Sequence, residues 1–552
     1  MKLSVDQALS LTETYGTHEC RKYRERIFSA HQFLSLALAR QYQRTNREKG
    51  YIEANRELGR LHKRLTLGTE FQGIFIDSPD EDVKRFAEQK SLAIHGVFQT
   101  YNTNIGSRRA IQEVIEYLEA CDLTFPLKNP DEASKLEIAQ ALLRCFDPDW
   151  WRRRIRKRQD LLLEHVMIEL GLVNKQKGIY ASNHCVERKL KQWQRNEDLL
   201  ASLEAENDLG QVFNLLDLAK RGVSNLVNRR NELMTRLSGF ESVAKDRGDS
   251  GVFYTLTAPS KYHSQLAKNC RPNPKYSGAS PRDTQEYFNQ VWARIRAKLK
   301  RIGIQPYGFR VVEPHHDGTP HWHMLLFVAP KDVETLNSTI RHYALEEDGT
   351  ERGAAHSRVK VEYIDPNKGS AVGYIAKYIA KNIDGEHVGT DHYGKDAIES
   401  ATRIRAWASN WSIRQFQSIG GPSVTVWREA RQFANSELAD KILDRIDDEK
   451  LKALVDAADT GNWKSFVELS GGPTAQRKDQ PLRALHVTKD EPNKYGEAVN
   501  KLLGLIYRGK EKIQTKIREW TVRSIDSSKK TSNIDDGFSI GGANAPPLEF
   551  CQ

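Results

Sequence analysis

The sequence is poor in cysteine, with six cysteines among 552 residues and no Cys-x-x-Cys pair. A zinc ribbon or a disulfide framework needs closely spaced or paired cysteines, so the spacing argues against both classes. Scattered cysteines are typical of reduced thiols inside a cell. We therefore expect a cytoplasmic protein.

Long apolar runs are also missing. No segment approaches the ~20 apolar residues that a membrane-spanning helix requires. The first residues include Asp6 and Glu13 and lack the apolar centre of a signal peptide. We therefore expect a soluble chain with no membrane partner.

A nucleotide-binding loop is absent as well. Residues 389–396 come within one residue of the pattern Gly-x-x-x-x-Gly-Lys-Ser/Thr, but Asp396 stands where a hydroxyl should meet Mg²⁺. No buried strand is predicted before the first glycine of this segment. We therefore predict that the chain uses no nucleotide cofactor and has no motor of its own.

Positive charge, by contrast, is abundant. The formal net charge is +11 and the isoelectric point is about 9.1. This balance favours a polyanionic partner such as nucleic acid, although a generic basic protein would show it too. The length predicts two or three domains with ample residues for a core.

A predicted β-hairpin brings together three side chains of metal-binding types. Residues 309–313 and 321–328 are rich in aromatic and branched residues, which favours strands, and the segment between them has turn chemistry. Side chains on a strand alternate between faces, so His321 and His323 share one side. Glu313 would lie opposite or next to His321. Two imidazoles and one carboxylate, with positions left open, are typical of a catalytic divalent-metal site.

Alternatives to this metal site remain. A His-x-His pair alone is more often incidental, and it is the carboxylate across the hairpin that favours a metal. His315 and His316 in the turn could also reach the site. We interpret them as loop residues that lie behind the ligands or face the substrate.

A second segment carries two tyrosines at helical spacing. Tyr374 and Tyr378 are four residues apart, and Lys377 and Lys381 each follow a tyrosine by three residues. An apolar stripe predicts a helix here, and residues four apart on a helix are neighbours. The alternative is that both rings merely pack against the core. A phenol has a pKa of about 10, so a nearby lysine would favour the nucleophilic phenolate.

These segments together resemble the two-tyrosine HUH endonucleases, and within them the replication gene A proteins of temperate tailed phages and their prophage relatives. The resembling stretches are 253–257, 313–327, 364–384 and 407–431. The resemblance implies nicking at a replication origin, a 5′-phosphotyrosine intermediate, and a free 3′-OH that primes rolling-circle synthesis. It also implies Mg²⁺ or Mn²⁺ as the metal.

Carried onto this chain, the resemblance makes His321, His323 and Glu313 the metal ligands and Tyr374 and Tyr378 the nucleophiles. The partner would be origin DNA, single-stranded at the nick site, in the cytoplasm of a bacterial host. Because no motor is predicted, a host replicative helicase would separate the strands.

Two further segments are candidates for DNA contact. Arg152, Arg153, Arg154 and Arg156 begin a predicted helix beside two tryptophans, and this face could grip phosphates and stack on bases. A solvated helix with its tryptophans in the core is the alternative. Trp411 and Arg414 belong to an aromatic and arginine-rich segment that suits single-stranded DNA, although part of it is expected to be core.

The order of predicted elements gives an α+β fold. Residues 246–435 would form a central HUH nuclease domain, in which helices flank an antiparallel sheet. A large helical region, 1–245, would precede it and bind the origin or a partner, and it includes the helical stretch 189–237. A small helical region, 436–525, would follow with helices at 437–458 and 495–523, and 526–552 would be a disordered tail.

Two other functions fit these features less well. A plasmid relaxase or a two-tyrosine transposase would use the same chemistry, but the likeness of 364–384 and 407–431 to phage proteins argues against it. A non-catalytic DNA-binding replication accessory protein would have a structural metal and packed tyrosines. Covalent attachment of the protein to DNA separates the enzymes from this last class.

Overall fold

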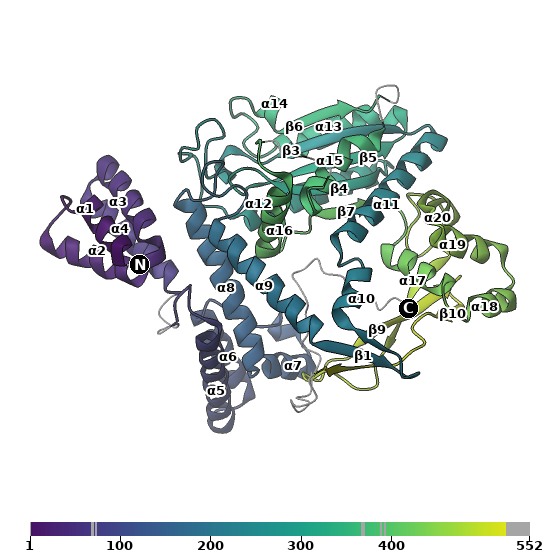
Figure 1. Cartoon of the computed structure of the whole chain (residues 1–552), viewed down its shortest axis with the longest axis horizontal. Coiled ribbons are helices and arrows are strands. Elements are labelled where there is room, and N and C mark those ends of the chain that lie inside the picture. The colour runs from purple at the N-terminus through teal and green to yellow at the C-terminus, as the bar shows by residue number, and fades with distance from the viewer. Residues whose placement is uncertain are drawn as a thin grey trace. The chain divides into compact units, whose positions relative to one another are not determined.

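The computed structural model describes residues 2–67, 71, 74–365, 370–386, 389–390 and 393–525. Contacts between these residues separate the chain into two compact units. Helices and strands of both units are labelled in Figure 1. The first contains residues 1–172 and 492–497, and the second contains residues 173–491 and 498–552. The tail predicted to be disordered, 526–552, lies outside the described residues.

The first unit is built from helices, as predicted for this part of the chain. In α4 the buried residues are Ala54, Leu58, Leu61 and Leu65, whose spacing of three or four places them on one face of the helix. That face enters the core and the opposite face stays in solvent. The helices are α1 (Lys2–Thr12), α2 (His18–Ala30), α3 (Ser35–Lys49), α4 (Tyr51–Leu65), α5 (Asp80–Asn104), α6 (Ser107–Ala120), α7 (Lys135–Cys145) and α8 (Pro148–Glu169).

An antiparallel sheet of five strands forms the centre of the second unit, and the α+β prediction is confirmed. The strand order is β6-β3-β5-β4-β7, and every neighbouring pair is antiparallel. The strands are β3 (Ser250–Thr257), β4 (Tyr307–Pro314), β5 (Pro320–Val328), β6 (Val359–Tyr363) and β7 (Phe416–Ile419). The hairpin predicted from the sequence is therefore the β4-β5 pair.

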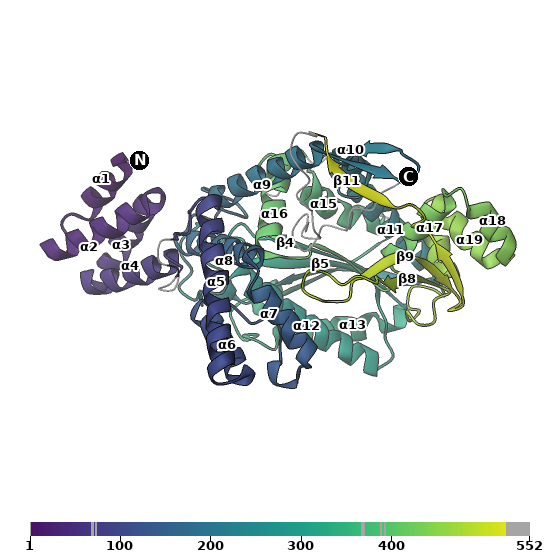
Figure 2. The ribbon, with the colours of Figure 1, turned by 90° about the horizontal axis from the view of Figure 1, so that it is seen from below.

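Helices cover both faces of this sheet, which gives three layers (Figure 2). Helices α12 (Pro281–Arg301) and α13 (Val333–Leu345) lie on one face, and α11 (Leu226–Arg247) and α15 (Ala371–Ile383) lie on the other. Every residue of β4 and β5 is buried as a result. A strand covered on both faces should be apolar throughout, so any polar side chain on it needs an explanation.

The remaining elements complete the second unit. Its other helices are α9 (Asn183–Ala201), α10 (Leu215–Arg221), α14 (Ala354–Ser357), α16 (Ala397–Trp411), α17 (Val424–Ala434), α18 (Ala439–Ile446), α19 (Glu449–Asp459) and α20 (Trp463–Leu469). Its other strands are β1 (Leu203–Asn207), β2 (Val212–Asn214), β8 (Leu482–Thr488), β9 (Asn500–Tyr507), β10 (Glu511–Gln514) and β11 (Trp520–Ser524). Strands β8 and β9 lie beside α17 (Figure 2).

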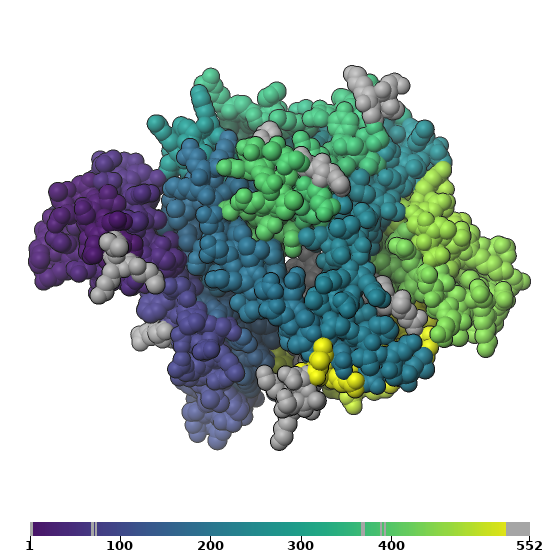
Figure 3. Space-filling view, in the orientation of Figure 1, coloured from purple at the N-terminus to yellow at the C-terminus, as the bar shows by residue number. Residues whose placement is uncertain are grey.

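The compact units divide at 172/173, whereas the predicted domain boundary is at 245/246. The reason is that α9 packs on α16, and α11 packs on α15 and α20. In the space-filling view the green surface of α16 lies beside the blue surface of α9 (Figure 3). Residues 173–245 therefore belong with the five-stranded sheet in the structure.

Two predicted helical stretches contain strands, and those predictions are wrong. The stretch 189–237 includes the β1-β2 hairpin, and 495–523 includes all of β9 and β10 and most of β11. Three residues, 508–510, connect β9 to β10, and two of them, Arg508 and Gly509, have positive φ of 46° and 74°, which suits a tight hairpin turn. Strand β1 pairs with β11, which lies far away in sequence. Pairing at that distance leaves no trace in the local spacing of apolar residues.

Candidate active site

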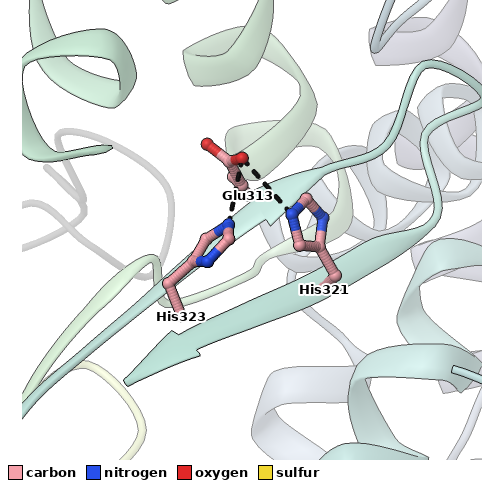
Figure 4. A group of neighbouring side chains, drawn as sticks. All are labelled: Glu313, His321 and His323. Carbon is pink, nitrogen blue, oxygen red and sulfur yellow. Dashed lines mark hydrogen bonds and ion pairs between the residues drawn. The ribbon is translucent and has the colours of Figure 1, made fainter. Parts of the chain in front are cut away.

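Glu313, His321 and His323 meet on one face of the β4-β5 hairpin (Figure 4). Glu313 pairs directly with His321 in the strand register, and His323 is two residues further along β5. The Nε2 atom of His321 lies 3.3 Å from Oε1 of Glu313, and the Nε2 atom of His323 lies 3.2 Å from the same oxygen. All three side chains are buried. The predicted convergence of these three residues is therefore present.

The Glu313 carboxylate is held from its other side by the end of α15. Lys381 Nζ lies 3.3 Å from Oε2 of Glu313, and Asn382 Nδ2 donates to the same oxygen at 3.1 Å. Burial disfavours the charged carboxylate, but Lys381 and the two histidines outweigh burial. They hold the pKa of Glu313 well below its usual range. The carboxylate is therefore ionised and points one oxygen at the histidine pair.

The orientation of His323 is set by Thr255 on β3. The Thr255 hydroxyl oxygen lies 3.1 Å from Nδ1 of His323, and the two residues are paired in the β3-β5 register. A partner on the far ring nitrogen selects the tautomer and leaves Nε2 free to bind a cation. Burial and the neighbouring His323 lower the pKa of His321 to about 4, so His321 is neutral near pH 7.

This donor set fits a divalent metal ion. The candidate ligand atoms of Glu313, His321 and His323 all lie within 4.8 Å of one another. Two imidazoles and one carboxylate on one side of a site leave the remaining positions for water and substrate. Within the described residues, this is the group of histidine and carboxylate side chains with metal-site spacing.

The turn between β4 and β5 is buried and closely fitted. The Asp317 carboxylate accepts hydrogen bonds from the backbone N–H groups of Ser264 and Thr319, each at 3.1 Å. Gly318 has a φ of 84°, and its carbonyl accepts a hydrogen bond from the Trp407 indole at 2.8 Å. These contacts fix the path of the chain on which the candidate ligands stand.

Of the two turn histidines, one packs directly against a candidate ligand. The His315 ring stacks on His321 with centroids 4.1 Å apart, while His316 is buried and contacts the ring of Tyr393. Burial lowers the pKa of both turn histidines. Through its stacking contact, His315 supports the candidate ligand His321.

Helix α15 presents both tyrosines toward the sheet. Ser370 caps its N-terminus through the Gly373 N–H, and the Glu241 carboxylate accepts hydrogen bonds from the N–H groups of Ala371 and Val372. A carboxylate at a helix N-terminus satisfies unbonded N–H groups and interacts well with the helix dipole. Ile375 and Ile379 are buried in the core between α15 and the sheet. This packing fixes the rotation of α15.

Tyr378 reaches the candidate metal ligands, and Tyr374 lies one turn away. The Tyr378 ring stacks on His323 with centroids 3.9 Å apart, and Phe253 stacks on both of these rings. The Tyr374 ring contacts Phe253, with centroids 6.3 Å apart. Both tyrosines are partly exposed. The structure therefore brings both predicted nucleophiles to the side of the sheet that carries the candidate ligands.

The lysines have different surroundings from those expected. Lys381 is buried against Glu313, and Lys377 is exposed on the helix surface. Burial, then Glu313 and Glu362, raise the pKa of Tyr378 to about 12. This is the reverse of the expected effect of a lysine on the phenol. Lys381 instead positions the carboxylate.

Asn382 is a site residue that the sequence reasoning missed. Its amide donates to Glu313 and to the Tyr378 carbonyl, at 3.1 and 2.6 Å. Its spacing was the available signal, because Tyr374, Tyr378 and Asn382 are successive residues four apart on one helix face.

The predicted DNA-contacting arginines of α8 have partners within the first unit. Arg152 and Arg156 both form ion pairs with Asp80, and Arg153 lies 3.8 Å from Asp147. The guanidinium of Arg154 lies over the Trp150 ring, and the tryptophans beside these arginines are buried. The rings therefore pack in the core, as in the alternative interpretation of this segment.

The other two residues predicted to contact DNA differ in their exposure to solvent. Trp411 is buried, with 2% of its surface exposed, so its ring cannot stack on a base in this conformation. Arg414 is exposed beside β7.

Among the described residues, no helix is both long and apolar enough to cross a membrane.

Comparisons with known proteins agree on one group. Residues 81–386 match the family described as bacteriophage replication gene A protein (GPA). The chain is 43% identical over 420 residues to the replication gene A protein of Escherichia phage 186, covering 74% of this chain and 59% of that protein. It is 42% identical over 380 residues to a probable replication protein of Pseudoalteromonas phage PM2, covering 68% of this chain and 57% of that protein.

A bacterial relative carries a more specific name. The chain is 34% identical over 429 residues to a probable replication endonuclease from a prophage-like region of Salmonella paratyphi A, covering 75% of this chain and 53% of that protein. The chain thus spans between half and three fifths of the length of these relatives. No solved structure matches it. The family match extends over more than half of the sequence and includes the hairpin and both tyrosines, so the chain belongs to the bacteriophage replication gene A protein family.

Proposed function

We propose that this chain is a metal-dependent tyrosine DNA endonuclease and strand transferase that nicks a replication origin and initiates rolling-circle replication. One observation carries the proposal: Tyr378 stacks on His323, which shares a buried carboxylate oxygen with His321. A candidate nucleophile therefore lies against a candidate divalent-metal site. The name of the Salmonella relative, a probable replication endonuclease, is consistent with this proposal.

The three hairpin residues would hold Mg²⁺ or Mn²⁺, and the metal would polarise the scissile phosphate and offset its developing charge. Glu313 presents Oε1 to the histidines while Asn382 donates to Oε2, and Lys381 lies 3.4 Å from Oε1 and 3.3 Å from Oε2. Thr255 holds His323 in position. The buried turn keeps the two strands from shifting relative to each other.

Cleavage would exchange one phosphate ester for another. The phenol oxygen of a tyrosine forms a bond to phosphorus while the bond from phosphorus to the 3′ oxygen breaks. The phenol loses its proton, and the departing 3′ oxygen gains one. The products are a 5′-phosphotyrosine and a free 3′-OH that can prime synthesis. The other tyrosine can cleave a second strand in the same way and release another 3′-OH. That 3′-OH can then attack the first phosphotyrosine, which joins the two strands and releases the first tyrosine as a free phenol. No outside energy source is needed, because the phosphotyrosine keeps the energy of the ester bond.

The proposed partners are single-stranded DNA at the origin and a host replicative helicase. The predicted ranges 1–245 and 436–525 remain proposals as functional regions, with origin or partner binding assigned to the first. The arginines of α8 remain DNA-contact proposals only for a state in which their ion pairs rearrange.

The test is covalent capture of labelled DNA. The full chain is incubated with a labelled single-stranded oligonucleotide carrying candidate origin sequence and Mg²⁺ or Mn²⁺, and the products are separated on a denaturing gel. We expect a slowly migrating protein–DNA adduct that is lost in the Tyr374→Phe/Tyr378→Phe double variant. Tight binding without an adduct in either metal would favour the accessory-protein alternative. An adduct that persists in the double variant would contradict the role of the tyrosines.

The DNA that receives the transferred strand distinguishes a replication initiator from a transposase or a relaxase. A replication initiator should rejoin the ends of its own origin sequence. Efficient transfer into unrelated DNA would favour a transposase, and transfer restricted to a plasmid transfer origin would favour a relaxase.

A further inference from the structure

A cavity rich in arginine opens at the edge of the sheet beside β7. Its volume is about 540 Å³. Five arginines line it, and Glu232 is the one acidic residue in its lining. We call this feature the arginine cavity, and its arginines are Arg229, Arg236, Arg414, Arg428 and Arg477.

The single carboxylate does not balance this charge. Glu232 pairs with Arg428 at 2.7 Å and with Arg236 at 3.2 Å. Within the described chain, Arg229, Arg414 and Arg477 form no ion pair. The Arg229 guanidinium lies over the Phe416 ring, 5.4 Å from its centroid. An anion in the cavity would therefore relieve an excess of positive charge.

Arg236 is the buried centre of the arginine cavity. It is 8% exposed, and its terminal nitrogens contact Ser418 and Glu232. Its Nε atom is buried and has no hydrogen-bond partner in the described part of the chain. Burial lowers the pKa of Arg236 to about 10, and the neighbouring arginines act in the same direction against Glu232. A buried donor without an acceptor carries a desolvation cost that a bound anion would offset.

A helix N-terminus faces the same cavity. Ser423, Val424 and Thr425 line it, and they begin α17. The first hydrogen bond of this helix runs from the Trp427 N–H to the Ser423 carbonyl, and the Ser423 side chain makes no capping bond. The N–H groups of the first turn therefore have no partner within the helix. Such a terminus attracts phosphate through these groups and through the helix dipole.

The loop before α17 is built to hold this terminus in place. Gly420 and Gly421 have φ of 75° and 72°, and the Gly421 N–H donates to the Pro473 carbonyl at 2.6 Å. A Cβ atom on Gly420 would lie 2.5 Å from that carbonyl oxygen. Only glycine fits these conformations and contacts, so the loop keeps a close approach that larger residues would break.

The arginine cavity lies on the face of the sheet that carries the candidate metal ligands. Phe309 lines the cavity, and Glu313 is four residues further along the same strand and on the same face. At the rise of an extended strand, four residues span roughly 13 Å. DNA bound at the metal site could therefore extend to the cavity.

We infer that the arginine cavity binds a backbone phosphate of the DNA strand that is cut, a few nucleotides from the scissile phosphate. This inference rests on the proposed function for the identity of the strand. The arginines would contact the phosphate oxygens from the sides, and the first turn of α17 would donate from the end.

The first experiment measures binding without cleavage. The full chain is titrated against single-stranded oligonucleotide in the presence of a chelator, over a series of salt concentrations. Each phosphate contact on single-stranded DNA contributes about 0.7 to the slope of log affinity against log salt concentration. We expect Arg414→Ala to reduce the slope by about that amount. Arg414 is exposed, so this variant should fold normally.

Arg301→Ala is the matched control. Arg301 is an exposed cation at the end of α12, on the opposite face of the sheet. Its removal changes the net charge equally and should leave the slope unchanged. Equal slopes for wild type, Arg414→Ala and Arg301→Ala would overturn the inference.

A second experiment locates the phosphate. Oligonucleotides carry one neutral methylphosphonate linkage at successive positions. At one position we expect the neutral linkage to weaken wild-type binding but to cause no further loss in Arg414→Ala. Equal loss in both proteins at every position would overturn the inference. Weaker binding of inorganic phosphate by Arg414→Ala, with DNA binding unchanged, would assign the cavity to a free phosphate group and also overturn it.

The two proposals can fail separately. If the wild-type protein forms the covalent adduct and Arg414→Ala binds DNA as the wild type does, the nuclease proposal holds and the phosphate-site inference is refuted. If a phosphate contact is mapped but no adduct forms, the DNA-binding inference holds and the nuclease proposal is refuted.

Discussion

The Tyr378 ring lies 3.9 Å from the His323 ring, centroid to centroid, in a stacked arrangement. Tyr374 is one helical turn away and contacts Phe253 instead. The two tyrosines are therefore not equivalent, although the sequence places both on the same helix face.

The first prediction concerns the order in which the tyrosines act. We expect Tyr378→Phe to reduce the first cleavage more than Tyr374→Phe, because Tyr378 lies against a candidate metal ligand. Phenylalanine keeps the ring contact, so both variants should fold. The measurement is the initial rate of adduct formation on a labelled oligonucleotide. Equal losses in the two single variants would show that position on α15 does not set the order.

The second prediction concerns the buried pair Glu313 and Lys381. Without metal, Glu313→Gln should destabilise the protein by about 3–5 kcal/mol, because it leaves the Lys381 ammonium buried without a carboxylate. Adding Lys381→Met should recover part of this stability and restore no cleavage. Denaturant unfolding of wild type, both single variants and the double variant gives the coupling energy. Additive effects would mean that the two residues do not stabilise each other.

The third prediction concerns metal binding. Mn²⁺ at one hundred times its dissociation constant should stabilise the wild-type protein by about 2.7 kcal/mol. His321→Ala should lose this gain together with cleavage. His342→Ala is the control, because His342 is an exposed histidine on α13 and should keep the full effect. If, in the absence of metal, His321→Ala unfolds at a much lower temperature than the wild-type protein, the cluster has a structural role instead.

The fourth prediction concerns the first unit at acidic pH. His31 is fully buried, and its Nε2 atom lies 2.9 Å from Nδ1 of His62. Burial, then His62, lower the pKa of His31 to about 4. The unfolded chain binds this proton near pH 6.5, so stability is complete above that value and falls as the pH drops toward 4. The loss for His31 is of the order of 3 kcal/mol.

Hydrogen exchange tests that prediction in the full chain. After correction for intrinsic rates, amides in α2 and α4 should open more easily at pH 5 than at pH 7. The His31→Gln variant should show a smaller difference between the two pH values. Identical opening free energies in wild type at both values would contradict the prediction.

Much of the site could be read from short stretches of sequence. Alternation along a strand places His321 and His323 on one side, and a spacing of four places Tyr374 and Tyr378 on one helix face. These relationships need only the local backbone geometry, and the structure has them all.

Relationships between distant segments were decided by the tertiary structure. Lys381 pairs with Glu313 instead of a phenol because α15 crosses the buried hairpin, where an unpaired carboxylate would be costly. Trp411 is buried because its side of α16 packs inward. The β1-β11 pairing and the arginine cavity join segments far apart in sequence. The sequence alone determined which chemical groups share a strand or a helix face, because backbone periodicity is local. Which of those faces meet depended on packing across the whole unit.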